Sequence, residues 1–245
     1  MSRADGRAAD ELRPLQIIPG TMPYAEGSAS IRLGDTHVLC SASVEDRLPG
    51  WLRGQGRGWV TAEYAMLPRA TKERTPREAV SGKQGGRTVE IQRLIGRSLR
   101  AGIDLKALGE RQIIIDCDVV RADGGTRCAA ISAGYVALAL AVAKLRALGK
   151  LSRDPLLAPV AAVSVGVVRG VTVLDLDYGE DSTAAVDCNV IGTANGEFVE
   201  IQATAEGKPF RRRELDDLVD LATLGLDGLF SAQREAIGIG GASVH

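Results

Sequence analysis

Residues 116–127 are suited to holding an anion. They join an apolar, alternating stretch to a long run of small apolar residues through the pair Gly124 and Gly125. A strand that leads through two glycines into a helix lets the backbone approach a ligand closely, and the first free N–H groups of the helix point at it. Thr126 adds a hydroxyl and Arg127 a guanidinium, both suited to phosphate oxygens. The alternative is an ordinary strand-to-helix turn in which Thr126 caps the helix.

A second cation, Arg87, stands at the predicted start of another helix. Residues 87–101 follow the helical spacing. The apolar stripe of this helix comprises Ile91, Leu94, Ile95 and Leu99. A positive charge at a helix N-terminus is disfavoured by the helix dipole unless an anion is present. Arg87 is therefore a better candidate for an anion ligand than the other arginines of this helix.

Two carboxylates, Asp181 and Asp187, are the candidates for acid–base or metal chemistry. Asp181 lies on a predicted turn, and Asp187 begins a strand between Val186 and Cys188. An acid inside an apolar strand is costly unless it is paired or holds a metal. Oxygen ligands suit Mg²⁺ or Mn²⁺, and two carboxylates are enough when phosphates and waters complete the shell. A desolvated or crowded carboxylate also has a raised pKa and can act as a general acid.

The neighbouring acids carry no such expectation. Asp175 and Glu180 are predicted to be turn and edge residues in water. No serine, cysteine or histidine arrangement resembles a nucleophile with its base, and His37 is the only histidine before the C-terminal one. The chemistry is therefore expected to centre on phosphate.

A basic stretch at residues 67–100 is the candidate contact with RNA. Pro68 and Pro76 prevent a helix in its first part, so Arg69, Arg74 and Arg77 are placed on an extended loop. Such a loop can follow a phosphate backbone. The alternative is a solvated loop with no ligand.

Hairpins and three long helices make up the predicted fold. Hairpins are expected at residues 28–44, 161–176 and 186–204, further strands at 15–19, 58–66 and 112–120, and helices at 87–101, 127–148 and 213–230. The fold class is α+β, with mixed sheets built from antiparallel hairpins and packed against helices. The order of elements suggests two similar halves.

Composition limits the class of protein further. The chain has 245 residues, 45% of them hydrophobic, and a net charge of -1, so it can bury a sizeable core and is not coated in positive charge. No membrane span is expected, because no apolar run reaches about 18 residues, and no signal peptide is expected, because residues 1–7 have no apolar core. The four cysteines are widely spaced and are expected to be buried free thiols, which suits a cytoplasmic protein.

Several motifs together resemble the ribonuclease PH family of phosphorolytic exoribonucleases, related to polynucleotide phosphorylase and the exosome ring. The resemblance runs over nearly the whole chain. It rests on residues 3–7, 27–28, 56–64, 66–71, 86–97, 116–118, 122–127, 175–178 and 180–182. It implies one ribonuclease PH-like domain over residues 1–245, with the fold also described as ribosomal protein S5 domain 2-like.

The resemblance also implies an activity and roles for the candidate residues. The expected reaction is phosphate-dependent 3′-5′ trimming of transfer-RNA precursors, a transfer-RNA nucleotidyltransferase activity that releases nucleoside diphosphates. The expected assembly is a homo-hexamer, a trimer of dimers. Inorganic phosphate maps onto Arg87, Gly125, Thr126 and Arg127. Catalytic and metal-linked acids map onto Asp181 and Asp187, with Mg²⁺ or Mn²⁺ as cofactor, and transfer-RNA contact onto Arg69, Arg74 and Arg77.

Two other functions are compatible with parts of the pattern. A non-catalytic RNA-binding ring subunit would lack the acids or the phosphate arginines, and this chain has both. A nucleotide-dependent phosphotransferase could use the glycine pair, but the chain has no P-loop lysine after it.

Overall fold

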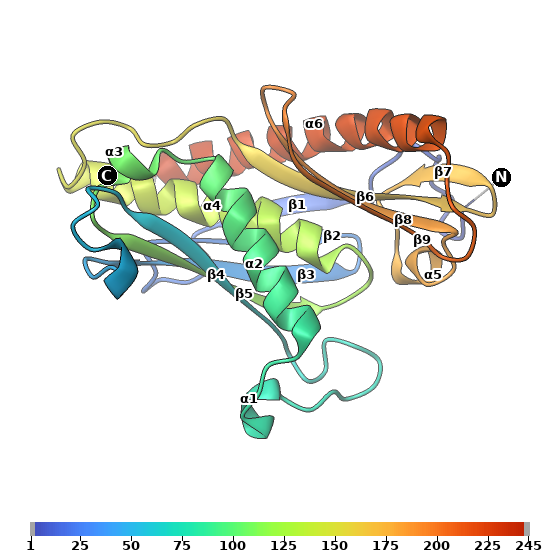
Figure 1. The fold of residues 1–245 in the computed structure, drawn as a ribbon, viewed down its shortest axis with the longest axis horizontal. Coiled ribbons are helices and arrows are strands. Elements are labelled where there is room, and N and C mark those ends of the chain that lie inside the picture. Colours follow the sequence, from blue (N-terminus) through green and yellow to red (C-terminus); the bar gives the residue numbers. More distant parts are fainter. Residues whose placement is uncertain (1–2, 243–245) are drawn as a thin grey trace.

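Two sheets form the framework of the computed structural model, which describes residues 3–242 (Figure 1). The first sheet has the order β1-β2-β3-β5-β4, and only its β4–β5 pair is parallel. Its strands are β1 (Leu15–Pro19), β2 (Gly27–Leu33), β3 (Thr36–Glu45), β4 (Trp59–Met66) and β5 (Gln112–Arg121). A 3-10 turn, η1 (Gly50–Leu52), interrupts the connection to β4. The parallel pair makes this sheet mixed, as predicted.

The second sheet is antiparallel throughout and has the order β7-β6-β8-β9. Its strands are β6 (Val160–Val168), β7 (Val171–Leu174), β8 (Val186–Thr193) and β9 (Phe198–Ala205). Both predicted hairpins of this half are confirmed. Their turns contain glycines at positive φ, Gly170 and Gly196, because L side chains rarely adopt that conformation.

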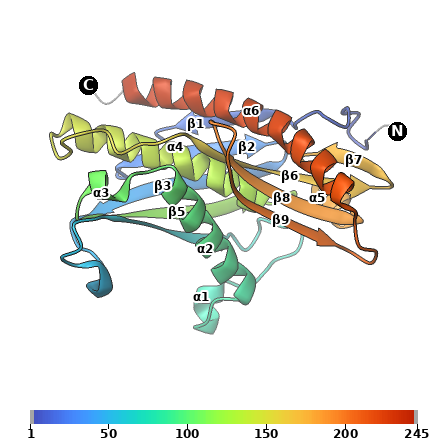
Figure 2. The same cartoon turned by 45° about the horizontal axis from the view of Figure 1, so that its top comes forward.

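Three long helices pack on these sheets, and three single-turn helices lie in the connections. The long ones are α2 (Gly86–Ala101), α4 (Thr126–Ala147) and α6 (Arg212–Ala242), and the short ones are α1 (Glu78–Ser81), α3 (Leu105–Leu108) and α5 (Tyr178–Asp181). The stripe predicted for α2 is confirmed, since its four apolar residues are fully buried. The predicted end of the last helix was wrong: α6 continues to Ala242 and runs over both sheets (Figure 2).

Helix α4 is the centre of the core. It packs on β2, β3 and β5 of the first sheet and on β6 of the second. One cluster of buried apolar residues therefore continues from one sheet to the other. By length and composition α4 could cross a membrane, contrary to the sequence expectation, but 89% of its apolar window is buried inside the protein. Its surface is already covered by the two sheets and the other helices.

The core also contains thiols and a serine hydroxyl. All four cysteines are buried and free, as predicted. The hydroxyl of Ser132 accepts from the Ala162 N–H at 3.2 Å and lies 3.4 Å from the Ala162 carbonyl oxygen. Ser132 thus ties α4 to β6.

The crossing of α4 over β2 leaves no room for a side chain at Gly27. A Cβ atom there would lie 2.1 Å from the carbonyl oxygen of Ala137 and 2.5 Å from the backbone nitrogen of Ala141. Both are backbone atoms of a helix, so neither can rotate away. Close packing of this kind makes added volume destabilising.

Gly27→Ala is accordingly predicted to lower the free energy of unfolding by about 1–3 kcal/mol or more, since α4 must shift from β2. Urea denaturation measures this. Gly238→Ala is the control, because Gly238 lies in α6 with nothing within 4 Å of the added atom. Helix propensity should make the control neutral or up to about 1 kcal/mol more stable. Equal stability of the two variants would contradict the close approach of α4 and β2.

Candidate active site

A cavity of about 1140 Å³ brings the predicted site residues together. It opens where the turn at 122–125 faces α5 and the start of β8. The predicted residues among its lining are Arg87, Gly125, Thr126, Arg127, Asp181 and Asp187. The cation-bearing elements come from the first half of the chain and the acids from the second. The cavity therefore exists only because the two halves pack together.

The turn between β5 and α4 has the conformation that its glycines allow. Gly124 and Gly125 have φ angles of 73° and 65°, in the left-handed region. Thr36 of β3 fixes the turn from behind: its hydroxyl donates to the Gly124 carbonyl at 2.7 Å and accepts from the Asp123 N–H at 3.1 Å. The first N–H groups of α4 have no acceptor within the helix, which leaves them available to an anion.

Thr126 does not cap α4, so the capping alternative was wrong. The N-cap is Gly125, which makes no side-chain hydrogen bond, and Thr126 is the first helical residue. Its hydroxyl lies 2.9 Å from the hydroxyl of Tyr64 in β4. Burial raises the pKa of Tyr64, although Thr126 and the two arginines oppose this. Tyr64 was missed because it looks like an ordinary buried strand residue.

Arg127 is held by two residues that the sequence did not single out. Its Nη1 donates to Oε1 of Gln202 on β9 at 3.1 Å and lies 3.5 Å from Oε2 of Glu90 on α2. The Nε2 of Gln202 is in turn 3.3 Å from Glu90 Oε1. These contacts fix the direction of the guanidinium from outside the turn.

Arg87 is the second residue of α2 and is exposed to the cavity. The N-cap of α2, Gly85, makes no side-chain hydrogen bond. The carboxylate of Glu78 lies beside this helix start, where it accepts from the Thr88 hydroxyl at 2.8 Å. Arg87 adds a positive side chain on the cavity side, and a positive charge there favours a bound anion.

The acids lie opposite these cations. Asp181 ends α5, and Asp187 is the second residue of β8. Burial and the nearby charge of Asp181 raise the pKa of Asp187 to about 6, although Arg127 and Arg87 oppose the rise. Burial also raises the pKa of Asp181, against the same two arginines. Asp187 is thus poised to hold or release a proton near neutral pH.

Asn189 shares the cavity with Asp187, as strand alternation predicts. Val186 precedes Asp187, and Cys188 lies between Asp187 and Asn189. Both are buried on the other face of the strand. The thiol of Cys128 on α4 donates to Asn189 Oδ1, with Sγ and oxygen 3.1 Å apart. This contact orients the amide of Asn189 beside the acids.

A metal site made by the protein alone is not found. Within residues 3–242 no group of three or more histidine, cysteine, aspartate or glutamate side chains is placed to hold an ion. Several carboxylates line the cavity, and among them Asp187 feels the like charge of Asp181.

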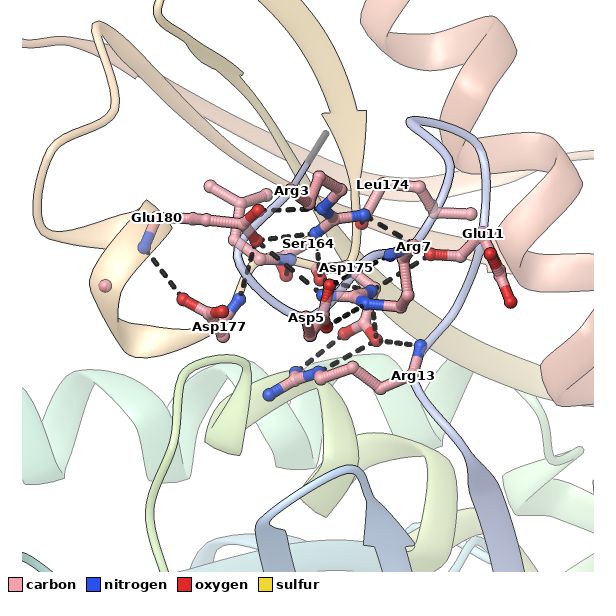
Figure 3. A network of polar contacts seen from close by, with 12 residues as sticks. Arg3, Asp5, Arg7, Glu11, Arg13, Ser164, Leu174, Asp175, Asp177 and Glu180 are labelled. Carbon is pink, nitrogen blue, oxygen red and sulfur yellow. Dashed lines mark hydrogen bonds and ion pairs between the residues drawn. The ribbon is translucent and has the colours of Figure 1, made fainter. Parts of the chain in front are cut away.

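The expectation that Asp175 and Glu180 are in water was wrong. Asp175 has no exposed surface, and Glu180 forms a two-pronged ion pair with Arg3 at 2.7 Å and 2.5 Å (Figure 3). Arg13 pairs with both oxygens of Asp175, and Arg7 lies 3.6 Å from one of them. The N-terminal segment therefore packs against the end of β7 and α5. Nothing local in the sequence pairs these distant residues.

The three arginines of the basic loop lie apart from the cavity lining. Residues 67–85 and α1 project from the body of the molecule in both views (Figures 1 and 2). Arg69, Arg74 and Arg77 are exposed on this loop and do not line the cavity. Thr71, Lys72, Glu73 and Thr75 of the same loop do. The loop thus connects an exposed basic segment to the mouth of the site.

Comparison with known proteins matches both halves of the chain. The models described as "3′ exoribonuclease family, domain 1" and "domain 2" match residues 11–144 and 158–224. Proteins named Ribonuclease PH are similar to it. One from Roseobacter denitrificans is 58% identical over 234 residues, with 96% of this chain and 99% of that protein covered. One from Cereibacter sphaeroides is 58% identical over 236 residues, with 96% and 100% covered.

Solved structures share the fold at lower identity. Rice Rrp46 has a TM-score of 0.78 and 18% identity, over 96% of this chain and all of that one. A chain of the Archaeoglobus fulgidus exosome with RNA bound to its active site has a TM-score of 0.75 and 23% identity, over 95% and 91%. These likenesses confirm the predicted fold class.

The buried position of Asp187 leads to a prediction about stability and pH. Its pKa is about 6 in the folded protein against an ordinary value of 3.8. A raised pKa means that the folded state binds the proton more tightly, so stability is lost as pH rises through 6. Asp187→Asn carries no charge at any pH. It should therefore gain stability relative to the parent between about pH 4 and pH 6, on the order of 1 kcal/mol after allowing for solvent screening.

Urea denaturation over this pH range, without phosphate or metal, measures the effect. Asp217→Asn, at an exposed acid of α6, is the control and should show no such pH-dependent gain. Asp181→Asn should lower the pKa of Asp187, observed by carboxyl NMR, because it removes a like charge. An Asp187→Asn variant whose stability differs from the parent by the same amount at pH 4 and pH 7 would contradict the raised pKa.

Proposed function

This chain belongs to the 3′ exoribonuclease family that includes ribonuclease PH, and we propose that it trims the 3′ ends of transfer-RNA precursors with inorganic phosphate. The observation that carries the proposal is the single cavity in which an anion-binding turn and Arg87 face an acid of raised pKa. The names of its relatives support the same activity. The reaction is a 3′-5′ phosphorolysis, and in reverse it adds nucleotides from nucleoside diphosphates.

The phosphate is held by the first half of the chain. The N-terminus of α4 offers N–H groups, Gly125 allows close approach, and Thr126 adds a hydroxyl. Arg87 and Arg127 supply two positive charges from two helix starts. Binding orients one phosphate oxygen toward the RNA and offsets the charge that develops during transfer.

The transfer replaces one phosphorus–oxygen bond by another. An oxygen of inorganic phosphate attacks the phosphorus of the last internucleotide linkage, and the bond to the 3′ oxygen of the penultimate nucleotide breaks. The terminal nucleotide leaves as a nucleoside 5′-diphosphate. The new 3′ oxygen takes a proton, which we assign to Asp181 or Asp187, since both line the cavity and both have raised pKa values.

The same two carboxylates would hold Mg²⁺ or Mn²⁺. Two carboxylates suit Mg²⁺ only when phosphate oxygens and waters complete its shell, which fits a cavity built to bind phosphate. A bound cation would neutralise charge on the transferring phosphoryl group.

The RNA would reach this cavity along the loop at 67–85. Arg69, Arg74 and Arg77 are exposed there and can follow a phosphate backbone, while other residues of the loop line the cavity mouth. Contacts of this kind bind RNA without reading its sequence. They suit an enzyme that recognises the shape of a transfer-RNA precursor.

The active form would be a homo-hexamer, a trimer of dimers, in the cytoplasm. The continuous buried cluster supports one domain over residues 1–245, although two family models match it. Exposed Met22 and Leu148 line a second hollow of about 620 Å³, and a subunit contact would remove such apolar surface from water. The four buried free thiols suit a reducing compartment.

The proposal predicts that a tailed transfer RNA releases nucleoside diphosphate only when phosphate is added. Water as the attacking group would give a monophosphate, so the product identifies the nucleophile. Arg127→Ala should lower the rate on the order of 10²–10³-fold, by analogy with the loss of a positioned donor to a developing charge. Asp187→Asn should lower it at least as much. Chromatography of the released nucleotides measures both.

Arg146→Ala is the matched control for loss of an arginine. Arg146 pairs with Asp154 on the surface, near the far end of α4. At 1.5 Å per residue it lies roughly 30 Å along the helix from Thr126. The control should keep the parental rate. Diphosphate release that persists in Asp187→Asn, or monophosphate as the product, would refute the proposal.

A further inference from the structure

The side chain of Arg13 connects the two halves of the site, and Figure 3 shows its contact with Asp175 in the second half. Its Nε and Nη2 donate to the carboxylate of Asp175 at 2.9 Å and 2.7 Å, and its backbone N–H donates to the same carboxylate at 2.8 Å. Its Nη1 donates to the backbone carbonyl of Asp123. Asp175 follows β7 in the second half, whereas Asp123 opens the turn of the first half. One guanidinium therefore holds both.

The contact with Asp123 sets the direction of a peptide unit in the turn. In a trans peptide the C=O and the following N–H point in opposite directions, and no described peptide bond is cis. Arg13 donates to the Asp123 carbonyl and Thr36 donates to the Gly124 carbonyl, so the two carbonyls point toward these side chains. The N–H groups of Gly124 and Gly125 must then point away from Arg13 and Thr36. These residues line the cavity proposed to bind phosphate.

Arg13 is buried, so water does not compete for its contacts. It is 4% exposed, and its partner Asp175 is fully buried at the left-handed φ of 53°. A buried carboxylate needs compensating charge and hydrogen bonds, which orient Arg13 toward the turn. The backbone N–H of Asp175 donates to the Ser164 carbonyl at 2.7 Å, so this anchor belongs to the second sheet.

The turn and the anchor also touch directly. A Cβ atom on Gly124 would lie 2.5 Å from the carbonyl oxygen of Leu176, and one on Gly125 would lie 3.2 Å from Nη2 of Arg13. The Tyr178 N–H donates to the Asp123 carboxylate at 3.3 Å. Residues 175–178 lead straight into α5, which ends at Asp181. A displacement of the turn would therefore shift α5 and, with it, Asp181.

We propose that Arg13 is a positioning residue that sets the phosphate-binding turn against the second sheet, through its paired contacts with Asp175 and the Asp123 carbonyl. Arg13 does not line the cavity, so it acts only through the backbone of the turn. The inference rests on the proposed function, because it assigns phosphate to that turn. It predicts a defect in phosphate use that is separable from folding and from RNA binding.

Two variants keep the buried charges balanced and so retain the fold. Arg13→Lys keeps a cation beside Asp175 but lacks the planar fork that serves two partners at once. The double variant Arg13→Gln with Asp175→Asn removes one charge of each sign and keeps hydrogen-bonding groups, and Arg7 still has Asp5 as an ion-pair partner. Both are expected to weaken the contact with the Asp123 carbonyl, because neither side chain has the guanidinium fork that serves Asp175 and Asp123 together. The KM for phosphate should rise on the order of 10–100-fold, as for loss of supporting contacts around a ligand.

Phosphorolysis is measured at varied phosphate and varied RNA, with the melting temperature of each protein. The expected result is a raised phosphate KM, an RNA KM within about two-fold of the parent, and a smaller melting-temperature gain on adding phosphate. Arg146→Gln, which breaks a surface ion pair, is the control and should match the parent.

The outcomes separate this inference from the proposed function. A parent protein that releases diphosphates without added phosphate overturns both. A phosphate-dependent parent, with folded variants whose phosphate KM is unchanged, overturns the role of Arg13 alone. A rise in RNA KM equal to the rise in phosphate KM, or loss of activity that tracks the melting temperature across all variants, also overturns it, because a general loss of structure would produce either result.

Discussion

The carboxylate of Asp175 lies in the interior with no exposed surface, and a charge in that position must be compensated by hydrogen bonds and opposite charge. Arg13 and Arg7 supply the charge from a segment at the other end of the chain. Arg3 meets the carbonyl of Asp175 at 2.9 Å and the carboxylate of Glu180 at 2.5 Å. Compensation of one buried acid thus folds the N-terminal segment onto β7 and α5. It also places Arg13 where it reaches the turn at Asp123.

The site needs this link because each half contributes a different kind of group. The first sheet and the starts of α2 and α4 present N–H groups and arginines, and the second sheet presents Asp181 and Asp187. Helix α4 joins the halves deep in the core, through its contacts with β2, β3 and β6. At the cavity the halves meet through polar contacts of a turn and of the start of α4. Arg13 holds the turn at Asp123, and Gln202 of β9 holds Arg127 of α4.

Patterns decided within a few residues were predictable from the sequence, and contacts between distant residues were not. Strand alternation, hairpin turns, the stripe of α2 and the glycine pair at 124–125 each depend on neighbouring residues, and the structure contains all of them. Asp175 was placed in water because its partner Arg13 is 162 residues away. Gln202 was missed for the same reason, since it meets Arg127 across 75 residues. The residues predicted to bind phosphate and the two predicted acids line one cavity, whereas the three arginines predicted to bind RNA lie outside it. The chemical roles of all of them are still predictions.

The charges around Asp187 make its protonation depend on whether phosphate is bound. Burial and Asp181 favour the protonated form of Asp187, and Arg87 and Arg127 oppose it. A phosphate anion bound by these arginines cancels much of their positive field, so the pKa of Asp187 must rise when phosphate binds. The acid is then more often protonated when the nucleophile is present than when the site is empty. In the proposed reaction phosphate would therefore have a second role besides attack, because its charge would help Asp187 to retain the proton that the departing 3′ oxygen requires.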